Sequence, residues 1–262
     1  KKFDKKLKKN HYFFSIASVL KSKVPGIFLK LILKVRSFNT SDFVGVVGIN
    51  QELLNFHRWI GYKVFLMNHH FFQNKNFKIK ILKKKYKRTI IAKTLNIIKI
   101  NKNNLSLIDK NIFKKQTPQK SNTYLLNRYI KNPFYKYNIY LLKKSNIKIL
   151  VISRILKVKK VSILKIIDCI YNREDFKYIG TSLQKILEET KCEYADMYSY
   201  GISKKLCQKS GFLNRYQGKE IIPEYFEPFV NKNIDIYGAY ISKNKNIRLF
   251  KGDGDMDRPS IL

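Results

Sequence analysis

The chain has 262 residues, which is enough for one large domain or two ordinary domains. Hydrophobic residues make up 44% of it and aromatic residues 14%, which excludes wholesale disorder because this much apolar surface can build a core. No apolar run reaches about 18 residues, so no membrane-spanning helix is expected.

The chain is strongly basic, with a formal net charge of +36 from 54 Lys and Arg against 18 Asp and Glu. Such a balance favours anionic partners, which include nucleic acid, an anionic membrane surface and a phosphorylated cofactor. The excess is mostly Lys and accompanies abundant Asn and Ile, the residues that AT-rich codons favour. Codon bias is therefore the main expected source of the charge, and the scattered lysines are read as solvated faces.

The first predicted elements begin at Gly26, which opens a helix over residues 27–34. Residues 43–49 then read as a buried strand that ends in a Gly-Ile turn. A short helix follows over residues 51–60, and Asn50 is its expected N-cap. Its apolar face contains Leu53, Phe56, His57 and Ile60.

The end of this helix is also marked in the sequence. Gly61 takes the left-handed position that favours glycine at a helix C-terminus. Trp59, in the last turn, is expected in the core. His69 and His70 follow a strand end, and adjacent strand residues point to opposite faces. Structural roles are therefore favoured for both histidines over a shared metal.

The expected domain boundary lies near the middle of the chain. Residues 116–121 are polar and contain a proline, which predicts an inter-domain linker. Residues 1–100 and 101–262 are therefore the two predicted units, with the boundary anywhere from about 85 to about 122. Next come three predicted strands with short connections, which should be antiparallel: 137–142, 147–155 and 162–171.

A second strand–helix unit then repeats the first. Gly180 opens a helix over residues 181–189, and Thr181 begins a capping-box pattern there. A strand, an N-cap and a glycine stop follow at residues 194–200, Ser203 and Gly211. Because the glycine spacing in the two units is nearly equal, we predict an internal repeat whose first copy is incomplete at its N-terminus.

This order of elements resembles the GNAT acyltransferase superfamily. Three sets of segments further resemble a tandem GNAT-like group found with surface-polysaccharide genes: residues 47–50 with 61–62 and 68–72, residues 221–229, and residues 250–259. The resemblance covers most of residues 24–262. It implies an α/β (α+β) fold of two GNAT-like units with mixed, mostly antiparallel sheets, the first unit N-terminally incomplete.

The resemblance also implies a donor and an acceptor. The donor is acyl-CoA, with acetyl-CoA as the expected co-substrate. Its pyrophosphate would bind backbone N–H groups at a helix start, which here are those of Gly180, Thr181 and Ser182. Arg173 precedes them, and Gly180 stands alone where the family loop has two glycines. The acceptor is an amine, expected to be an amino sugar of a surface glycan precursor or a sugar nucleotide.

Three residues are candidates for catalysis. Asp168 and Asp196 lie in the strands that such a fold places side by side, where the acyl group would sit. A carboxylate there could deprotonate an attacking ammonium if burial raised its pKa toward neutral. Tyr198 could return a proton to the leaving thiolate. The competing interpretation is that both Asp side chains bind backbone groups or lysines.

The C-terminal segment offers alternating carboxylates and an arginine. Asp253, Asp255, Asp257 and Arg258 could recognise the acceptor by hydrogen bonds to its hydroxyl or ammonium groups. The pattern resembles the start of a calcium loop but lacks its later Gly and Glu, so no metal is expected. A solvated tail is the third interpretation.

Three hypotheses for function follow. The first is an N-acyltransferase, the second a degenerate GNAT-like binding protein without catalysis, and the third a basic nucleic-acid-binding protein. No strong nucleic-acid motif is present, so nucleic acid ranks last. Three cysteines without a zinc-like spacing favour a reduced, cytoplasmic protein, with peripheral contact to an anionic membrane as a further expectation.

Overall fold

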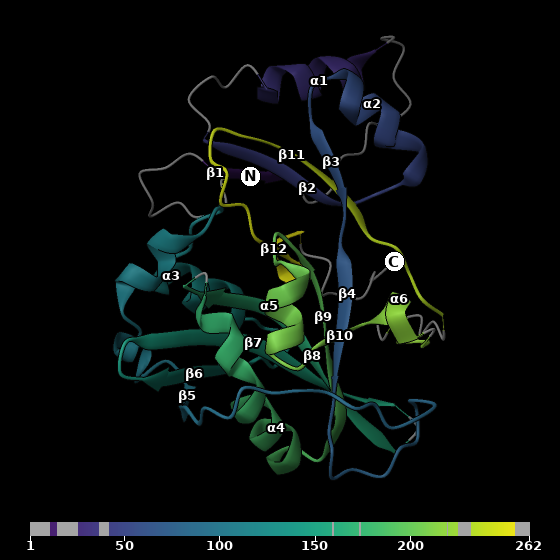
Figure 1. Cartoon of the computed structure of the whole chain (residues 1–262). Helices are drawn as coiled ribbons and strands as arrows, with labels where there is room; N and C mark the ends of the chain where they lie inside the picture. Colours follow the sequence, from purple (N-terminus) through teal and green to yellow (C-terminus); the bar gives the residue numbers. More distant parts are fainter. Residues whose placement is uncertain are drawn as a thin grey trace.

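The computed structural model describes residues 11–14, 26–36, 42–158, 160–172, 174–218, 220–224 and 232–254. These residues form two β-sheets with helices packed against them (Figure 1). Both sheets are mixed, and antiparallel pairs predominate, as predicted. Among these described residues, no helix is both long and apolar enough to cross a membrane.

The first sheet is the smaller one. Its strands follow the order β1 (His11–Phe14), β2 (Phe43–Ile49), β11 (Tyr237–Ser242) and β3 (Lys63–Leu66). β1 is parallel to β2, whereas β11 is antiparallel to both of its neighbours. Helices α1 (Ile27–Arg36) and α2 (Leu54–Trp59) lie beside this sheet, and Ile32 of α1 shares an apolar cluster with Val44 of β2.

The second sheet is larger and holds the strands predicted after residue 137. Its order is β10 (Leu213–Asn214), β4 (Asn68–Gln73), β9 (Cys192–Tyr200), β8 (Val161–Tyr171), β7 (Ile147–Val158), β6 (Asn138–Lys144) and β5 (Asn96–Ile100), with β12 (Leu249–Phe250) also paired to β9. β8 and β9 are parallel, and the other pairs in this sheet are antiparallel.

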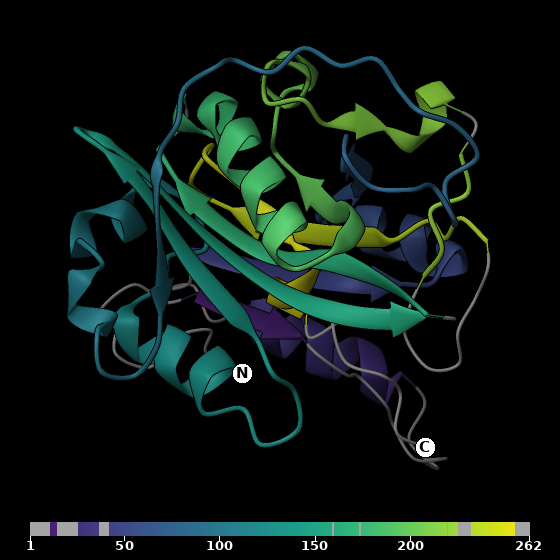
Figure 2. The ribbon, with the colours of Figure 1, turned by 90° about the horizontal axis from the view of Figure 1, so that it is seen from below.

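Helices cover both faces of the second sheet (Figure 2). α4 (Ile179–Glu189) buries Ile179, Leu183, Ile186 and Leu187 in one cluster with α5 (Lys204–Lys209). These positions lie one or two turns apart, so they form one face of the helix. The opposite face of the sheet packs against α3 (Asn122–Leu125) and the turns around it. A last short helix, α6 (Arg215–Gly218), follows β10.

The two sheets exchange strands. β3 runs directly into β4 through Met67, yet β3 belongs to the first sheet and β4 to the second (Figure 1). In return β11, from the C-terminal part of the chain, lies between β2 and β3. β4 occupies the matching place between β9 and β10. Neither sheet is therefore built from one continuous half of the sequence.

The glycine turns of the predicted repeat have matching geometry. Gly61 and Gly211 both have φ of 85°, which confirms the left-handed helix stops, and the turn glycines Gly48 and Gly201 both have φ of 86°. Gly180 breaks the match, because it lies within the first turn of α4 and lacks the positive φ of Gly26.

Several local predictions were wrong. Asn50 makes no side-chain cap, whereas Ser203 accepts the Leu206 N–H as predicted. Trp59 is 73% exposed and not in the core, because the buried face of its helix uses Leu54, His57 and Ile60. Leu53, which was expected on that face, is 39% exposed.

The segment predicted to be a linker is buried. Gln116, Thr117 and Lys120 are each at most 2% exposed. Thr117 exchanges backbone hydrogen bonds with the C-terminal segment, accepting from Arg248 and donating to Asn246. Polar composition suggested a solvated linker, but the backbone of Thr117 and the ammonium group of Lys120 have partners inside the protein.

Candidate functional site

The parallel strands β8 and β9 pair over only the first part of their length. Their pairing begins at Ser162 and Cys192 and ends at Ile166 and Met197. Beyond these residues β8 continues to Tyr171 and β9 to Tyr200 without pairing to one another. The described residues thus contain one gap between two diverging parallel strands, at the carboxyl ends where α/β proteins place ligands.

A segment near the C-terminus occupies this gap. β12 pairs with β9 at Tyr200 and Ser199. The Arg248 guanidinium donates to the Tyr171 carbonyl of β8, with Nη1 2.6 Å from the oxygen. At Gly252 a Cβ atom would stand 2.7 Å from Ile167 Cγ2 of β8. Residues 247–254 therefore bridge the two strands and fill the deeper part of the gap.

A cavity of about 350 Å³ lies at the mouth of the gap. Tyr171 and Tyr200 line it at the ends of β8 and β9, and its cations are Lys63, Lys245 and Arg248. The acidic residue in its wall is Glu174, whose side chain is 73% exposed. Three cations against one solvated carboxylate make this cavity attractive to anions.

Asp168 belongs to a buried ionic cluster on the face opposite α4. Lys120 Nζ lies 2.5 Å from Asp168 Oδ1 and 2.9 Å from Asp253 Oδ1, and the Tyr129 hydroxyl donates to Asp168. Burial would lower the pKa of Lys120, but the two carboxylates outweigh it and hold this pKa above its ordinary value. Burial raises the pKa of Asp253 to about 6, although Lys120 opposes the shift.

Asp196 belongs to a second buried cluster. Its Oδ2 accepts from Lys165 Nζ at 2.5 Å and from His69 Nε2 at 2.7 Å. Burial lowers the pKa of His69 to about 4, so the ring is neutral near pH 7 and Nε2 carries the proton. Although burial raises the pKa of Asp196, Lys165 and His69 outweigh it and hold this pKa below its ordinary value. The condition for a catalytic base, a pKa raised toward neutral by burial, is therefore not met at Asp196.

Tyr198 lies beside this second cluster. Its ring stacks on His69 with centroids 3.8 Å apart, and its hydroxyl donates to the Ile234 carbonyl. Burial raises the pKa of Tyr198 above its ordinary value. The hydroxyl proton is thus held by a backbone carbonyl. Both Asp side chains bind lysines, as the competing interpretation of the sequence had it.

The predicted pyrophosphate residues lie in α4. The helix begins at Ile179 and directly continues a 3₁₀ turn over Asp175–Tyr178. Thr181 does not cap the helix, because its hydroxyl donates to the Ile91 carbonyl. Gly180 packs against the Ser210 carbonyl and Ile90, and Ser182 is fully buried. Arg173 lies outside the described residues.

The predicted acceptor residues are divided. Asp253 is buried and bound to Lys120, so the solvated-tail interpretation was wrong for this residue. Asp255, Asp257 and Arg258 lie outside the described residues. No group of three His, Cys, Asp or Glu able to hold a metal ion occurs in the part of the chain that is described. All three cysteines are buried and free.

Sequence reasoning missed the lysines that hold these carboxylates, and the pair of Lys251 with Glu224. Lys251 Nζ lies 2.5 Å from Glu224 Oε1, and both side chains are at most 8% exposed. Lys165 had a usable signal, since it lies among apolar residues of a mostly apolar strand and a buried lysine needs a partner. Lys120 and Lys251 had none, because their segments read as a linker and a tail.

Comparison with known proteins finds structures with a similar fold. No protein-family model and no curated protein matches the sequence. Among solved structures, a GCN5-related N-acetyltransferase from Anabaena variabilis ATCC 29413 is similar over 85% of this chain, with a TM-score of 0.51 and 12% identity. The fold is that of a GNAT protein. A conserved protein of unknown function from Enterococcus faecalis V583 gives a TM-score of 0.49 at 11% identity over 85% of this chain. The chain spans 52% of each of these two structures, about half their length.

Proposed function

We propose that this chain is a GNAT-type N-acyltransferase that binds acyl-CoA at the mouth between β8 and β9 and transfers the acyl group to an amine. The observation that carries the proposal is the parting of these parallel strands beyond Ile166 and Met197, next to a cationic cavity. A gap of this kind can take an extended thioester arm between two strands while charged groups stay at the mouth.

The cations of the cavity suit the phosphates of CoA. Lys63 and Lys245 are exposed at its rim, whereas Arg248 is buried in its wall. A phosphate held by one lysine at 4 Å gains on the order of 1–4 kcal/mol between fully solvated and surface dielectric conditions. We place the phosphates here in preference to the start of α4, because the 3₁₀ turn before α4 and the Gly180 contacts occupy that position.

We also propose that the two sheets are two GNAT-like units that exchange a strand. The order β1, α1, β2, α2, β3 in the first sheet matches β8, α4, β9, α5, β10 in the second, and β11 and β4 are inserted at matching places in the two sheets. The division near residue 100, and the amino sugar as acceptor with Asp255, Asp257 and Arg258 as its ligands, stay predictions from the sequence.

A second function, binding without catalysis, is favoured by two observations. Residues 247–254 fill the deeper part of the gap. Asp168 and Asp196, the predicted catalytic carboxylates, are paired to lysines. A chain of this kind could hold acyl-CoA phosphates at the mouth without presenting the thioester to an external amine.

Calorimetric titration with acetyl-CoA, paired with a thiol-release assay on amine acceptors, separates these functions. We expect saturable binding that Lys63→Glu with Lys245→Glu weakens at least tenfold. The control Lys144→Glu, an exposed lysine on β6, should leave binding unchanged. Release of thiol with an amine supports the transferase, binding without release supports the binding protein, and absence of binding rejects both.

A further inference from the structure

We propose that Lys251 is an acyl-acceptor site, so that the chain acylates its own lysine within the gap between β8 and β9. This inference rests on the proposed function, since the donor must first bind at the mouth of the gap. It goes beyond that function because the acceptor amine is supplied by the protein.

The position of Lys251 is set by elements on both sides of it. It directly follows β12, which pairs with β9 at Ser199 and Tyr200. Its Nζ lies 5.2 Å from the centroid of the Tyr198 ring on β9. Its other neighbour along the chain, Gly252, packs against Ile167 of β8. The backbone of Lys251 therefore stands between the diverging strands, three residues beyond Arg248 in the wall of the cavity, and its amine lies over the Tyr198 ring of β9.

The surroundings of Lys251 suit a nucleophilic amine. Its side chain is 3% exposed, and Glu224 Oε1 lies 2.5 Å from Nζ, within reach to accept a proton. Burial lowers the pKa of Lys251 to about 8, although Glu224 opposes the shift. The neutral amine is therefore a larger share of Lys251 at pH 7 than of a solvated lysine.

Lys120 provides the contrast within the same molecule. It is equally buried but lies between the carboxylates of Asp168 and Asp253, which hold its pKa above the ordinary value. Its ammonium therefore stays protonated and cannot attack a carbonyl. Burial alone does not set the pKa of a buried lysine: at Lys251, Glu224 and Asp196 oppose the effect of burial, while the nearby cation of Lys165 adds to it.

The reaction balances without any further reactant. Glu224 accepts a proton from the Lys251 ammonium, and the neutral Nζ attacks the thioester carbonyl carbon. The C–N bond forms, the C–S bond breaks, and the CoA thiolate takes the second proton from nitrogen. An amide and free CoA thiol result, and one proton passes from Glu224 to solvent.

Two physical consequences follow from the packing. Side chains fill the space around Lys251, so the thioester reaches it only when residues 247–254 shift, and the reaction should be slow and limited to one acyl group per chain. Acylation removes the positive charge that faces Glu224 and leaves this carboxylate buried without its countercharge. The modified segment should therefore be held less firmly in the gap.

The test is to incubate the purified full chain with acetyl-CoA and no other amine, and to follow modification by intact-mass measurement and peptide mapping. We expect one acetyl group, on Lys251. Glu224→Gln should slow this labelling at least tenfold, and Lys251→Arg should abolish it. Buried Lys120 should stay unmodified, and exposed Lys144 reports the rate of uncatalysed acylation in the same sample.

The possible results distinguish this inference from the proposed function on which it rests. Lys251 labelling that exceeds the Lys144 rate and falls in Glu224→Gln supports the inference. Calorimetric binding of acetyl-CoA by the unmodified chain, with Lys251 labelled no faster than Lys144, overturns the inference and leaves the proposed function standing. Absence of acetyl-CoA binding overturns both.

Discussion

His69, Lys165 and Asp196 come from three neighbouring strands and meet in the interior of the second sheet. The lysine and the neutral imidazole both donate to one carboxylate oxygen, so the cluster keeps an ion pair where an isolated charge would be too costly. Burial lowers the pKa of His69, and Lys165 and His69 together hold the pKa of Asp196 below its ordinary value. The sensitivity of the fold to acid can therefore be tested at individual residues of this cluster.

Replacing His69 with Gln keeps a donor near Asp196 and removes a titrating group. Burial lowers the pKa of His69 from 6.5 to about 4, so between these values the unfolded chain binds more protons than the folded chain. The stability that His69 contributes above pH 6.5 is therefore lost as the pH falls toward 4, by about 3 kcal/mol. Urea unfolding across this range should show a smaller pH dependence for the variant. Equal slopes for the two proteins would contradict this assignment.

The sequence located the buried carboxylates but not their partners. Asp168 and Asp196 stand out because each interrupts an apolar strand, which is a local signal. His69 lies 127 residues from Asp196 along the chain, and Lys120 lies 48 residues from Asp168. Contacts at such separations depend on strand order, and the strand exchange that sets this order has no periodic signature in the sequence.

At the level of the element, the segment that fills the gap depends on glycines. Gly201, at the turn after β9, has φ of 86°, and a Cβ atom there would lie 1.9 Å from the Ile247 carbonyl oxygen. The backbone of the turn at Gly201 therefore lies close to the backbone of Ile247, where the 247–254 segment enters the gap. The repeat in the sequence predicts a Gly-Ile turn at this position, but the close contact with Ile247 arises from tertiary structure alone.

Gly201→Ala should destabilise the chain by more than its backbone angle accounts for. A left-handed φ costs alanine on the order of 1–2 kcal/mol, and displacement of the 247–254 segment adds to that cost. Gly26→Ala is the matched control, since Gly26 has φ of 71° and its added Cβ meets no described atom within 4 Å. Thermal unfolding should show the larger loss for Gly201→Ala. Equal losses would mean that the segment is not held against this turn.

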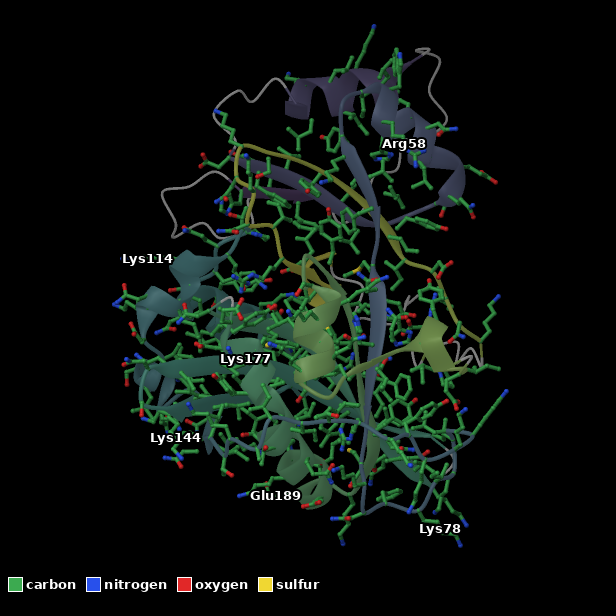
Figure 3. The ribbon with its side chains drawn as sticks, viewed as in Figure 1. Arg58, Lys78, Lys114, Lys144, Lys177 and Glu189 are labelled. Atoms are coloured by element: carbon green, nitrogen blue, oxygen red, sulfur yellow. The ribbon has the colours of Figure 1, made fainter. Side chains whose placement is uncertain are left out.

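At the scale of the whole molecule, charged side chains lie on several edges, whereas one hydrophobic cluster includes residues of both sheets. Lys78, Lys114 and Lys144 project at well-separated edges of the molecule (Figure 3). These three lysines are exposed, which agrees with the interpretation of scattered lysines as solvated faces. The core behaves differently, because one apolar cluster joins Phe65 of β3 in the first sheet to Tyr198 of β9 in the second.

Strand exchange makes the two predicted units dependent on one another. A fragment of residues 101–262 lacks β4 and β5, which leaves the backbone groups of β9, β10 and β6 without the partners they have in the intact chain. Exposed strand edges of this kind promote aggregation. We therefore expect this fragment to be insoluble alone and to become soluble when residues 1–100 are co-expressed with it, as measured by gel filtration of the complex.

The composition of that complex distinguishes strand exchange from simple docking. Phe71 and Phe72 of β4 are fully buried against the second sheet, so Phe71→Asp with Phe72→Asp in the 1–100 fragment should abolish rescue. Leu53→Asp, at an exposed position beside α2, is the matched control and should preserve it. A soluble, folded 101–262 fragment would show that the second sheet does not need β4, and that the sequence division near residue 100 is a true domain boundary.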